Sequence, residues 1–135
     1  MSAESDAINR IEQELVDAVN AGDLNQFLGT LADDVMYHPP EQPRITGKNA
    51  VHLWLKETFF DPFRMRLGLT LDELEVLGSL AVGHGRFALL LAPRAGGSDT
   101  RMTGRFIHIF RGNSDGSWKF ARVIWISDQP AAGGQ

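Results

Sequence analysis

The sequence predicts an α+β protein in which three N-terminal helices pack on one face of a curved, mixed or antiparallel sheet. Two observations favour this class. Apolar residues recur at helical spacing through most of residues 1–60, whereas alternate residues are apolar through most of residues 64–127. The predicted element order is α-α-β-α-β-β-β-β, and helices segregated from a run of strands are typical of α+β domains. The 135 residues suffice for one domain, which we place at residues 1–129, followed by a flexible tail at 130–135.

The amino-acid composition excludes several kinds of protein. The chain has no cysteine, so it holds no disulfide scaffold, no thiolate nucleophile and no cysteine-ligated metal. No window offers about 18 uninterrupted apolar residues, and the N-terminus is acidic and amphipathic rather than built like a signal peptide. We therefore expect a soluble, cytoplasmic protein that does not contact a membrane.

Charge is distributed unevenly along the chain. Residues 1–61 carry 11 acidic and 4 basic side chains, residues 62–135 carry 6 acidic and 9 basic ones, and the net charge is −4. The arginines of the second half are spaced along predicted strands rather than clustered with stacking aromatic residues. A net acidic chain is a poor partner for a polyanion, because phosphate contacts dominate nucleic-acid affinity. We expect no nucleic-acid partner.

Two helices are predicted at the start of the chain. The first follows the cap-type residues Ser5 and Asp6 and ends at Gly22, which can adopt the left-handed conformation found at helix C-termini. Asp23 is placed to cap a second, short helix. The acidic pair at residues 33–34 is expected to close that second helix.

The remainder of the chain is predicted as one more helix and five strands. The helix covers about residues 48–60 and follows a loop at 41–47. The strands are expected near residues 35–38, 64–71, 80–92, 100–111 and 118–127.

The phase of the strands decides which side chains face the helices. In residues 102–110 the even positions are apolar apart from His108, so His108 is the one ionisable group expected on the buried face of that strand. The apolar positions of the preceding strand are odd, which sends His84 to the opposite face. Apolar residues also occur on the outer face, and we expect a second copy of the chain to cover it in a homodimer.

Four short motifs, taken in order along the chain, resemble the ketosteroid isomerase-like proteins. They are VNAGD at 19–23, LADDV at 31–35, ITGKNAV at 45–51 and DGSWKFAR at 115–122 with WISD at 125–128. That family shares the cystatin-like α+β cone of nuclear transport factor 2, and the last motif is similar to its SnoaL-like branch. The resemblance covers nearly the whole chain and implies this cone. It implies no single activity, because the fold hosts isomerases, dehydratases, cyclases, hydrolases and non-catalytic binding proteins.

The resemblance does not supply the catalytic residues of the steroid isomerases. The position of their tyrosine donor corresponds to Leu15, and that of their aspartate base corresponds to Pro39. Their second donor, a protonated aspartic acid on a central strand, corresponds approximately to His108. We therefore expect no conventional steroid isomerase activity.

His108 and Tyr37 are the candidate catalytic residues. A neutral imidazole in an apolar pocket can orient a ligand carbonyl or move a proton, and the alternative for His108 is a core histidine satisfied by a backbone carbonyl. Tyr37 is the only tyrosine in the chain, so any phenol that polarises a substrate is this one. The alternative for Tyr37 is a strand aromatic with its hydroxyl at the rim. Glu41, at the expected mouth of the cone, is either a mobile base or a solvated loop residue.

A wall of apolar side chains is expected to bind the ligand. Its members are Leu15, Phe27, Trp54, Phe59, Phe87, Phe106 and Trp125. Such a wall suits a flat hydrophobic ligand, although plain core packing uses the same residue types. We expect no metal, because strand phase separates His84 from His108 and no paired histidine spacing occurs. We expect no other cofactor.

Three functions stay open at the level of sequence. The first is a SnoaL-like enzyme that transfers a proton on a hydrophobic carbonyl compound without a cofactor, giving isomerisation, cyclisation or dehydration. The second is a non-catalytic binding protein that holds a small apolar ligand in the same cone. The third is a dimeric assembly domain whose cone is filled by its own side chains.

Overall fold

The computed structural model describes residues 2–128 and has the α+β architecture expected from the sequence. The proposed tail at 130–135 lies outside the described residues, as does position 129, the expected end of the domain. The elements are α1 (Ala3–Ala21), α2 (Leu24–Gly29), β1 (Leu31–His38), β2 (Ile45–Thr46), α3 (Lys48–Leu55), the π-helical turn η1 (Lys56–Phe60), β3 (Phe63–Leu77), β4 (Leu80–Pro93), β5 (Thr100–Gly112) and β6 (Trp118–Ser127).

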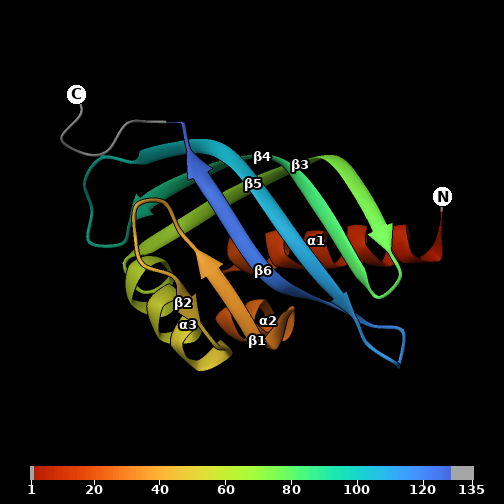
Figure 1. The fold of residues 1–135 in the computed structure, drawn as a ribbon. Helices are drawn as coiled ribbons and strands as arrows, with labels where there is room; N and C mark the ends of the chain where they lie inside the picture. The colour runs from red at the N-terminus through yellow and green to blue at the C-terminus, as the bar shows by residue number, and fades with distance from the viewer. Residues whose placement is uncertain (1, 129–135) are drawn as a thin grey trace.

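Six strands form one curved sheet in the order β2-β1-β6-β5-β4-β3, and the three helices gather on one of its faces (Figure 1). The sheet is mixed, because β1 and β6 run parallel whereas the other neighbouring pairs are antiparallel. Although β6 follows the other described strands in the sequence, it lies between β1 and β5, so it joins the N-terminal half of the chain to the long antiparallel strands. Within residues 2–128, no helix is long and apolar enough to cross a membrane.

Helix α1 begins earlier than the sequence predicts. Ser2 is its N-cap, and the Ser2 hydroxyl accepts a hydrogen bond from the Ser5 backbone N–H at 3.0 Å, so the predicted caps Ser5 and Asp6 lie inside the first turn. The predicted C-terminus is confirmed, since Gly22 has φ 67° and ends the helix. Asp23 caps α2 as expected, with its carboxylate accepting from the Gln26 N–H at 3.0 Å.

The second helix ends one turn before its predicted end. The Thr30 hydroxyl donates to the Phe27 carbonyl at 2.6 Å, which closes α2, and the Thr30 carbonyl accepts from the Phe120 N–H and so begins the pairing with β6. Leu31 and the acidic pair at 33–34 therefore belong to strand β1, and the prediction that this pair closes a helix is wrong. The hydrogen bond of the Thr30 side chain and the strand pairing that begins at the same residue therefore end the helix, even though the apolar spacing would allow it to continue to Leu31.

Glycines face aromatic rings across β4 and β5 on the inner side of the sheet. The pairs are Gly83 with His108, Gly85 with Phe106, and Gly104 with Phe87. A Cβ placed on Gly104 would meet the Ile126 carbonyl oxygen and come within 2.7 Å of the Phe87 ring. At Gly85 and Gly104 backbone atoms already occupy the space of a Cβ, and at Gly83 a leucine methyl group lies within 2.9 Å of it.

Replacing Gly104 by alanine should therefore destabilise the protein by about 1–3 kcal/mol, because the new methyl group overpacks a backbone contact. Gly68→Ala is the matched control, since Gly68 lies on strand β3 and a Cβ at that position would have no neighbouring atom within 4 Å. Its free energy of unfolding should change by less than about 0.5 kcal/mol. Denaturant unfolding measures both values, and equal effects would show that Gly104 is not sterically required.

Candidate functional site

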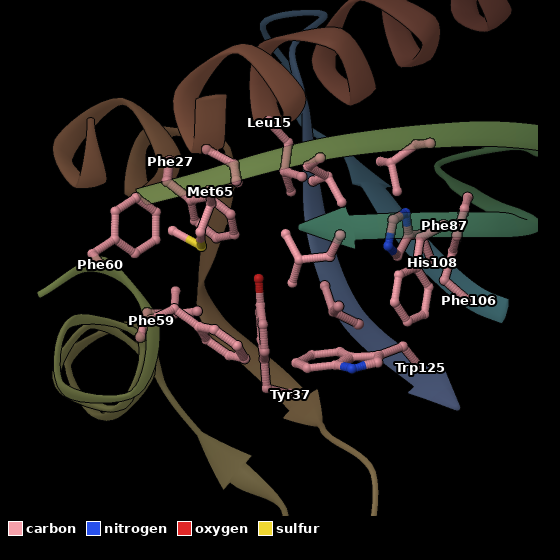
Figure 2. A pocket seen from close by; sticks show the side chains of 16 residues that line it. Leu15, Phe27, Tyr37, Phe59, Phe60, Met65, Phe87, Phe106, His108 and Trp125 are labelled. Carbon is pink, nitrogen blue, oxygen red and sulfur yellow. The ribbon is translucent and has the colours of Figure 1, made fainter. Parts of the chain in front are cut away.

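A cavity of about 110 Å³ lies between the helices and the inner face of the sheet (Figure 2). Sixteen residues line it, drawn from α1, α2, α3, η1 and five strands, and all but Tyr37 and His108 are apolar. Such a lining excludes water from most of the cavity surface, so the two polar side chains act in a medium where hydrogen bonds and charges are strengthened.

Most of the predicted ligand-binding wall lines this cavity. The residues found there are Leu15, Phe27, Phe59, Phe87, Phe106 and Trp125. Trp54 does not line it, contrary to the prediction. The next residue, Leu55, takes the inward position on α3, while the Trp54 ring packs behind the wall at centroid distances of 5.5 Å from Phe59 and 5.9 Å from Trp125. One residue step along a helix rotates the side chain by about 100°, which separates these two positions.

The two polar side chains of the cavity belong to a single row across the sheet. Tyr37 on β1 is in register with Val123 on β6, and Val123 is in register with His108 on β5. Adjacent strands lie about 4.8 Å apart, so the two polar residues start roughly 10 Å from each other. The short side chain of Val123 lies between two longer ones, and all three line the cavity. This row places Tyr37 and His108 on opposite sides of a common space.

The Tyr37 side chain is almost entirely buried, with a relative exposure of 2%. Its hydroxyl points into the cavity rather than to the rim (Figure 2). Among the described residues, no hydrogen bond to this hydroxyl is found. Burial raises the pKa of the Tyr37 phenol far above its usual value. The phenol therefore stays protonated and can donate to an oxygen atom in the cavity.

His108 is paired with a buried carboxylate, not with a backbone carbonyl. Its Nδ1 lies 2.8 Å from Oε2 of Glu12, and the two residues are only 4% and 7% exposed. The other ring nitrogen, Nε2, makes no hydrogen bond to any residue within 2–128. Glu12 does not line the cavity. The His108 imidazole therefore lies between the Glu12 carboxylate, on the side of helix α1, and the space of the cavity. In this arrangement a carboxylate can orient an imidazole and fix which ring nitrogen faces the cavity.

Aromatic rings fix the plane of the imidazole. Phe106 stacks on His108 with a centroid distance of 4.2 Å and an interplanar angle of 25°, and Phe120 meets it edge-on at 5.0 Å. The second carboxylate oxygen of Glu12, Oε1, is buried without a hydrogen-bond partner in the described chain. An unpaired buried oxygen of this kind lowers the stability of the folded protein.

Glu12 is a candidate site residue that the sequence pattern did not predict. A helical signal for it exists, because Glu12 follows Ile8 by four residues and precedes Leu15 by three, and both of those residues are buried. An acidic side chain on the apolar face of an amphipathic helix needs a polar or charged partner once it is buried. His108 is the ionisable residue expected on the buried face of its strand, which makes it a candidate partner for Glu12.

Other polar candidates lie away from the cavity. Glu41 is exposed and does not line it, and His84 is on the outer face, where its Nε2 lies 2.7 Å from Oε1 of Glu73. His84 and His108 are thus on opposite faces, as the strand phase predicts. Within residues 2–128, no group of three His, Asp or Glu side chains could hold a metal ion.

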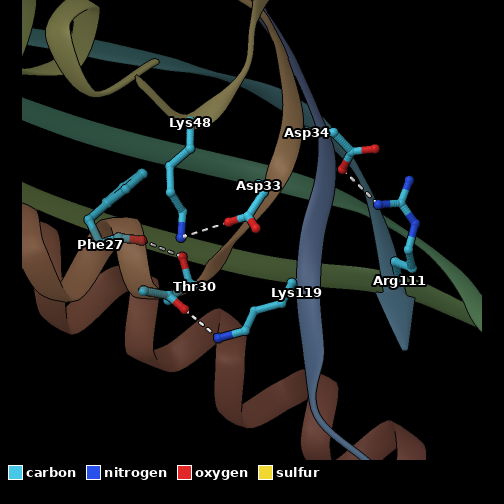
Figure 3. Close-up of polar contacts among 8 residues, drawn as sticks. Phe27, Thr30, Asp33, Asp34, Lys48, Arg111 and Lys119 are labelled. Atoms are coloured by element: carbon cyan, nitrogen blue, oxygen red, sulfur yellow. Dashed lines mark hydrogen bonds and ion pairs between the residues drawn. The ribbon is translucent and has the colours of Figure 1, made fainter. Parts of the chain in front are cut away.

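A second, polar depression of about 370 Å³ lies at the end of β1 and β6 (Figure 3). Arg111 bonds Asp34 at 2.7 Å and lowers the pKa of that carboxyl, while Lys48 lies 3.7 Å from the fully exposed Asp33. Lys119 donates to the Gly29 carbonyl at 2.5 Å. Each of these charges already has a partner in the chain and most are well solvated, so the depression is explained as a surface ion-pair network.

Comparison with known proteins agrees with this architecture. A ketosteroid isomerase-like protein from Erwinia carotovora has a TM-score of 0.84 and 19% identity, covering 96% of this chain and 100% of that one. An NTF2-like protein with a cystatin-like fold from Novosphingobium aromaticivorans has a TM-score of 0.78 and 13% identity, covering 96% and 85%. A protein from Streptomyces avermitilis, assigned provisionally as a dehydratase of the NTF2-like family, has a TM-score of 0.81 and 16% identity, covering 94% and 97%.

The fold is therefore the cystatin-like α+β cone of the NTF2-like proteins. The family model of the SnoaL-like domain matches residues 13–121, and the chain belongs to that family. No curated protein matches the sequence. At these identities the solved structures establish the fold of the chain and not its chemistry.

Because Tyr37 is the only tyrosine, ultraviolet titration reports on this residue alone. Burial raises its pKa, so the folded protein should show no tyrosinate absorbance near pH 10, where an unfolded tyrosine is half ionised. The folded state then holds this proton more tightly than the unfolded state. Stability should fall as the pH rises above about 10. Tyrosinate absorbance should appear only when the protein unfolds, at the same pH at which tryptophan fluorescence changes. A tyrosine titration midpoint near pH 10 in the folded protein would instead show that the hydroxyl is in solvent.

Proposed function

We propose that this chain is a small-molecule enzyme that transfers a proton on a hydrophobic carbonyl compound without a cofactor. The observation that carries the proposal is the buried Glu12–His108 pair, whose imidazole lines an apolar cavity that Tyr37 also enters. The reaction class is isomerisation, cyclisation or dehydration, each of which begins by moving a proton next to a carbonyl or hydroxyl group. Conventional steroid isomerisation is not proposed, since Leu15 and Pro39 replace the groups it requires.

In the proposed mechanism His108 is the acid–base group. With Nδ1–H donating to Glu12, the lone pair of Nε2 is free to take a proton from a carbon next to the substrate carbonyl. The carboxylate of Glu12 then stabilises the imidazolium, and the same nitrogen returns the proton to the product. Glu12 acts through His108 and is a positioning residue.

Tyr37 is proposed to bind the carbonyl oxygen. Its protonated phenol donates a hydrogen bond to the negative charge that develops on that oxygen when the proton is removed. The two groups reach the substrate from opposite ends of the row that Val123 completes. Relatives of similar fold named as a ketosteroid isomerase-like protein and provisionally as a dehydratase give the proposal support from related chemistry.

Exchange of the α-protons of cyclopentanone in D₂O, followed by NMR, tests this step without knowledge of the natural substrate. The protein should accelerate the exchange, and His108→Gln should reduce the acceleration by about 10²-fold or more, because the neutral amide cannot take up a proton. Glu12→Gln should reduce it at least tenfold through the loss of charge behind the imidazole. Tyr37→Phe should reduce it by a similar factor.

The chain offers a matched control on its outer face. His84 also pairs with a glutamate, Glu73, at 2.7 Å, but lies in solvent and away from the cavity. His84→Gln should leave the exchange rate unchanged. If the His108→Gln and His84→Gln variants accelerate the exchange of cyclopentanone protons equally, His108 is not the base.

The apolar lining also favours a second candidate, a protein that binds an apolar molecule without transforming it. In that case cyclopentanone or a related probe raises the melting temperature, while the exchange rate stays at its value in buffer for every variant. The same pair of measurements therefore separates an enzyme from a binding protein. The cytoplasmic location expected from the sequence stays a prediction.

We also propose that the outer face of the sheet joins two copies of the chain. Val82, Ile107 and Ile126 are 36–53% exposed there. One row across this face runs from Glu75 on β3 through Val82 and Ile109 to Arg122 on β6. If two copies meet face to face around a two-fold axis parallel to the strands, the acidic end of each row lies over the basic end of the other.

Charge reversal tests this dimer. Glu75→Arg and Arg122→Glu should each weaken association by at least tenfold in light scattering or sedimentation, because like charges then face each other, and the double variant should restore it. Leu53→Lys is the control, since Leu53 is 56% exposed on α3 outside this face. A protein that stays monomeric at all concentrations, or a double variant that remains dissociated, contradicts the arrangement.

A further inference from the structure

We infer that the substrate of this cavity is a neutral compound with a single small ring, or an open-chain compound of equal bulk, and that Val123 sets this limit. The inference rests on the proposed function, which it makes more specific. It follows from the volume of the cavity, the charge of its lining and the register of one cross-strand row.

The volume of the cavity limits the size of the ligand. At about 110 Å³ it is somewhat smaller than the roughly 150 Å³ of an apolar cavity that holds one benzene molecule. A fused two-ring or four-ring compound exceeds this volume, so part of it would remain outside the apolar space between Tyr37 and His108. Seven of the sixteen lining residues are Phe, Tyr or Trp, and some of these rings contact one another, such as Trp125 against Tyr37 at 5.8 Å. Close-packed rings resist displacement.

The lining also limits the charge of the ligand. Among the described residues, no Lys, Arg, Asp or Glu lines the cavity, and Glu12 lies behind His108. A carboxylate or phosphate on the substrate would lose its hydration without meeting a Lys or Arg side chain, which weakens its binding. The cationic side chains Lys48, Arg111 and Lys119 belong to the separate polar depression. The oxygen of the substrate is therefore that of a ketone, an aldehyde or an alcohol.

Val123 determines the space between the two polar groups. It lies in register between Tyr37 and His108, and its side chain is 4% exposed and lines the cavity. A ligand that accepts from the Tyr37 hydroxyl at one end and presents a proton to His108 at the other must lie over this side chain. The size of the side chain at position 123 therefore limits the size of the ligand ring that can reach both Tyr37 and His108. Val123 acts as a specificity-determining residue.

Binding of four probes tests the inference, measured by tryptophan fluorescence or by ligand-observed NMR. Cyclopentanone should bind at least tenfold more tightly than 2-decalone, which has a second fused ring, and at least tenfold more tightly than cyclopentanecarboxylate, which adds a charge. Cycloheptanone, with two more methylene groups than cyclopentanone, should bind weakly to the natural protein.

Variants at position 123 give the decisive comparison. Val123→Ala should improve the binding of cycloheptanone relative to cyclopentanone by about tenfold, the change that two additional buried methylene groups supply. Val123→Phe should abolish binding of all three ketones. Val16→Phe is the control, because Val16 is half-buried on α1 and does not line the cavity, so it should leave the order of affinities unchanged. If Val123→Phe does not fold, the gain in Val123→Ala still decides the question.

The inference is overturned if 2-decalone or cyclopentanecarboxylate binds as tightly as cyclopentanone, if no ketone binds, or if Val123→Ala leaves the cycloheptanone ratio unchanged. These outcomes are distinct from failure of the proposed function. Selective binding without proton exchange would retain the size limit and remove the catalysis. Proton exchange with no preference among ring sizes would retain the catalysis and remove the size limit.

Discussion

The contact between Glu12 and His108 is the interaction on which the rest of the cavity depends. It joins the first helix to the fifth strand across 96 positions of sequence and places two ionisable groups where almost no water reaches. A buried pair of this kind contributes little net stability, yet removing one partner costs about 3–5 kcal/mol because the other is left uncompensated. Together with the hydrogen bonds between Asn20 and the Leu67 backbone, the pair positions α1 against the sheet. In this orientation Leu15 and Val19 of α1 line the cavity.

The sheet separates two environments by the alternation of its side chains. On β4, the inner positions face the cavity and the core, while the outer positions carry His84, Arg86 and exposed aliphatic residues. The chain consequently contains the same chemical pair twice, as Glu12–His108 inside and Glu73–His84 outside, at 2.8 Å and 2.7 Å. Only the inner pair is enclosed by apolar atoms. Environment, and not the identity of the residues, distinguishes a candidate catalytic pair from a solvated ion pair.

The sequence predicted the fold class, the order of the long elements and the phase of β4 and β5, because these follow from periodicity and from glycine and proline positions. His108, Tyr37 and six of the seven lining residues expected from the sequence line the cavity. Their positions were predictable because apolar residues at regular spacing lie on the same face of a helix or strand. The prediction failed where a local contact overrode the pattern. The Thr30 hydroxyl ended α2 early, and Leu55 displaced Trp54 from the inner face of α3. The partner of His108 could not be identified, because the register between α1 and β5 depends on packing between segments that are distant in sequence.

The central place of β6 has a consequence for the synthesis of the protein. During translation the chain emerges from its N-terminus, so α1, Tyr37 and His108 are all exposed before residues 118–127 exist. Until then β1 has no partner on the side that β6 occupies, and β5 presents an open edge. The nascent chain must keep two unpaired strand edges apart from other chains for the time needed to add β6. The cavity can therefore be completed only after β6 has been synthesised, and a chain that stops before Trp118 lacks the lining residues Val123 and Trp125.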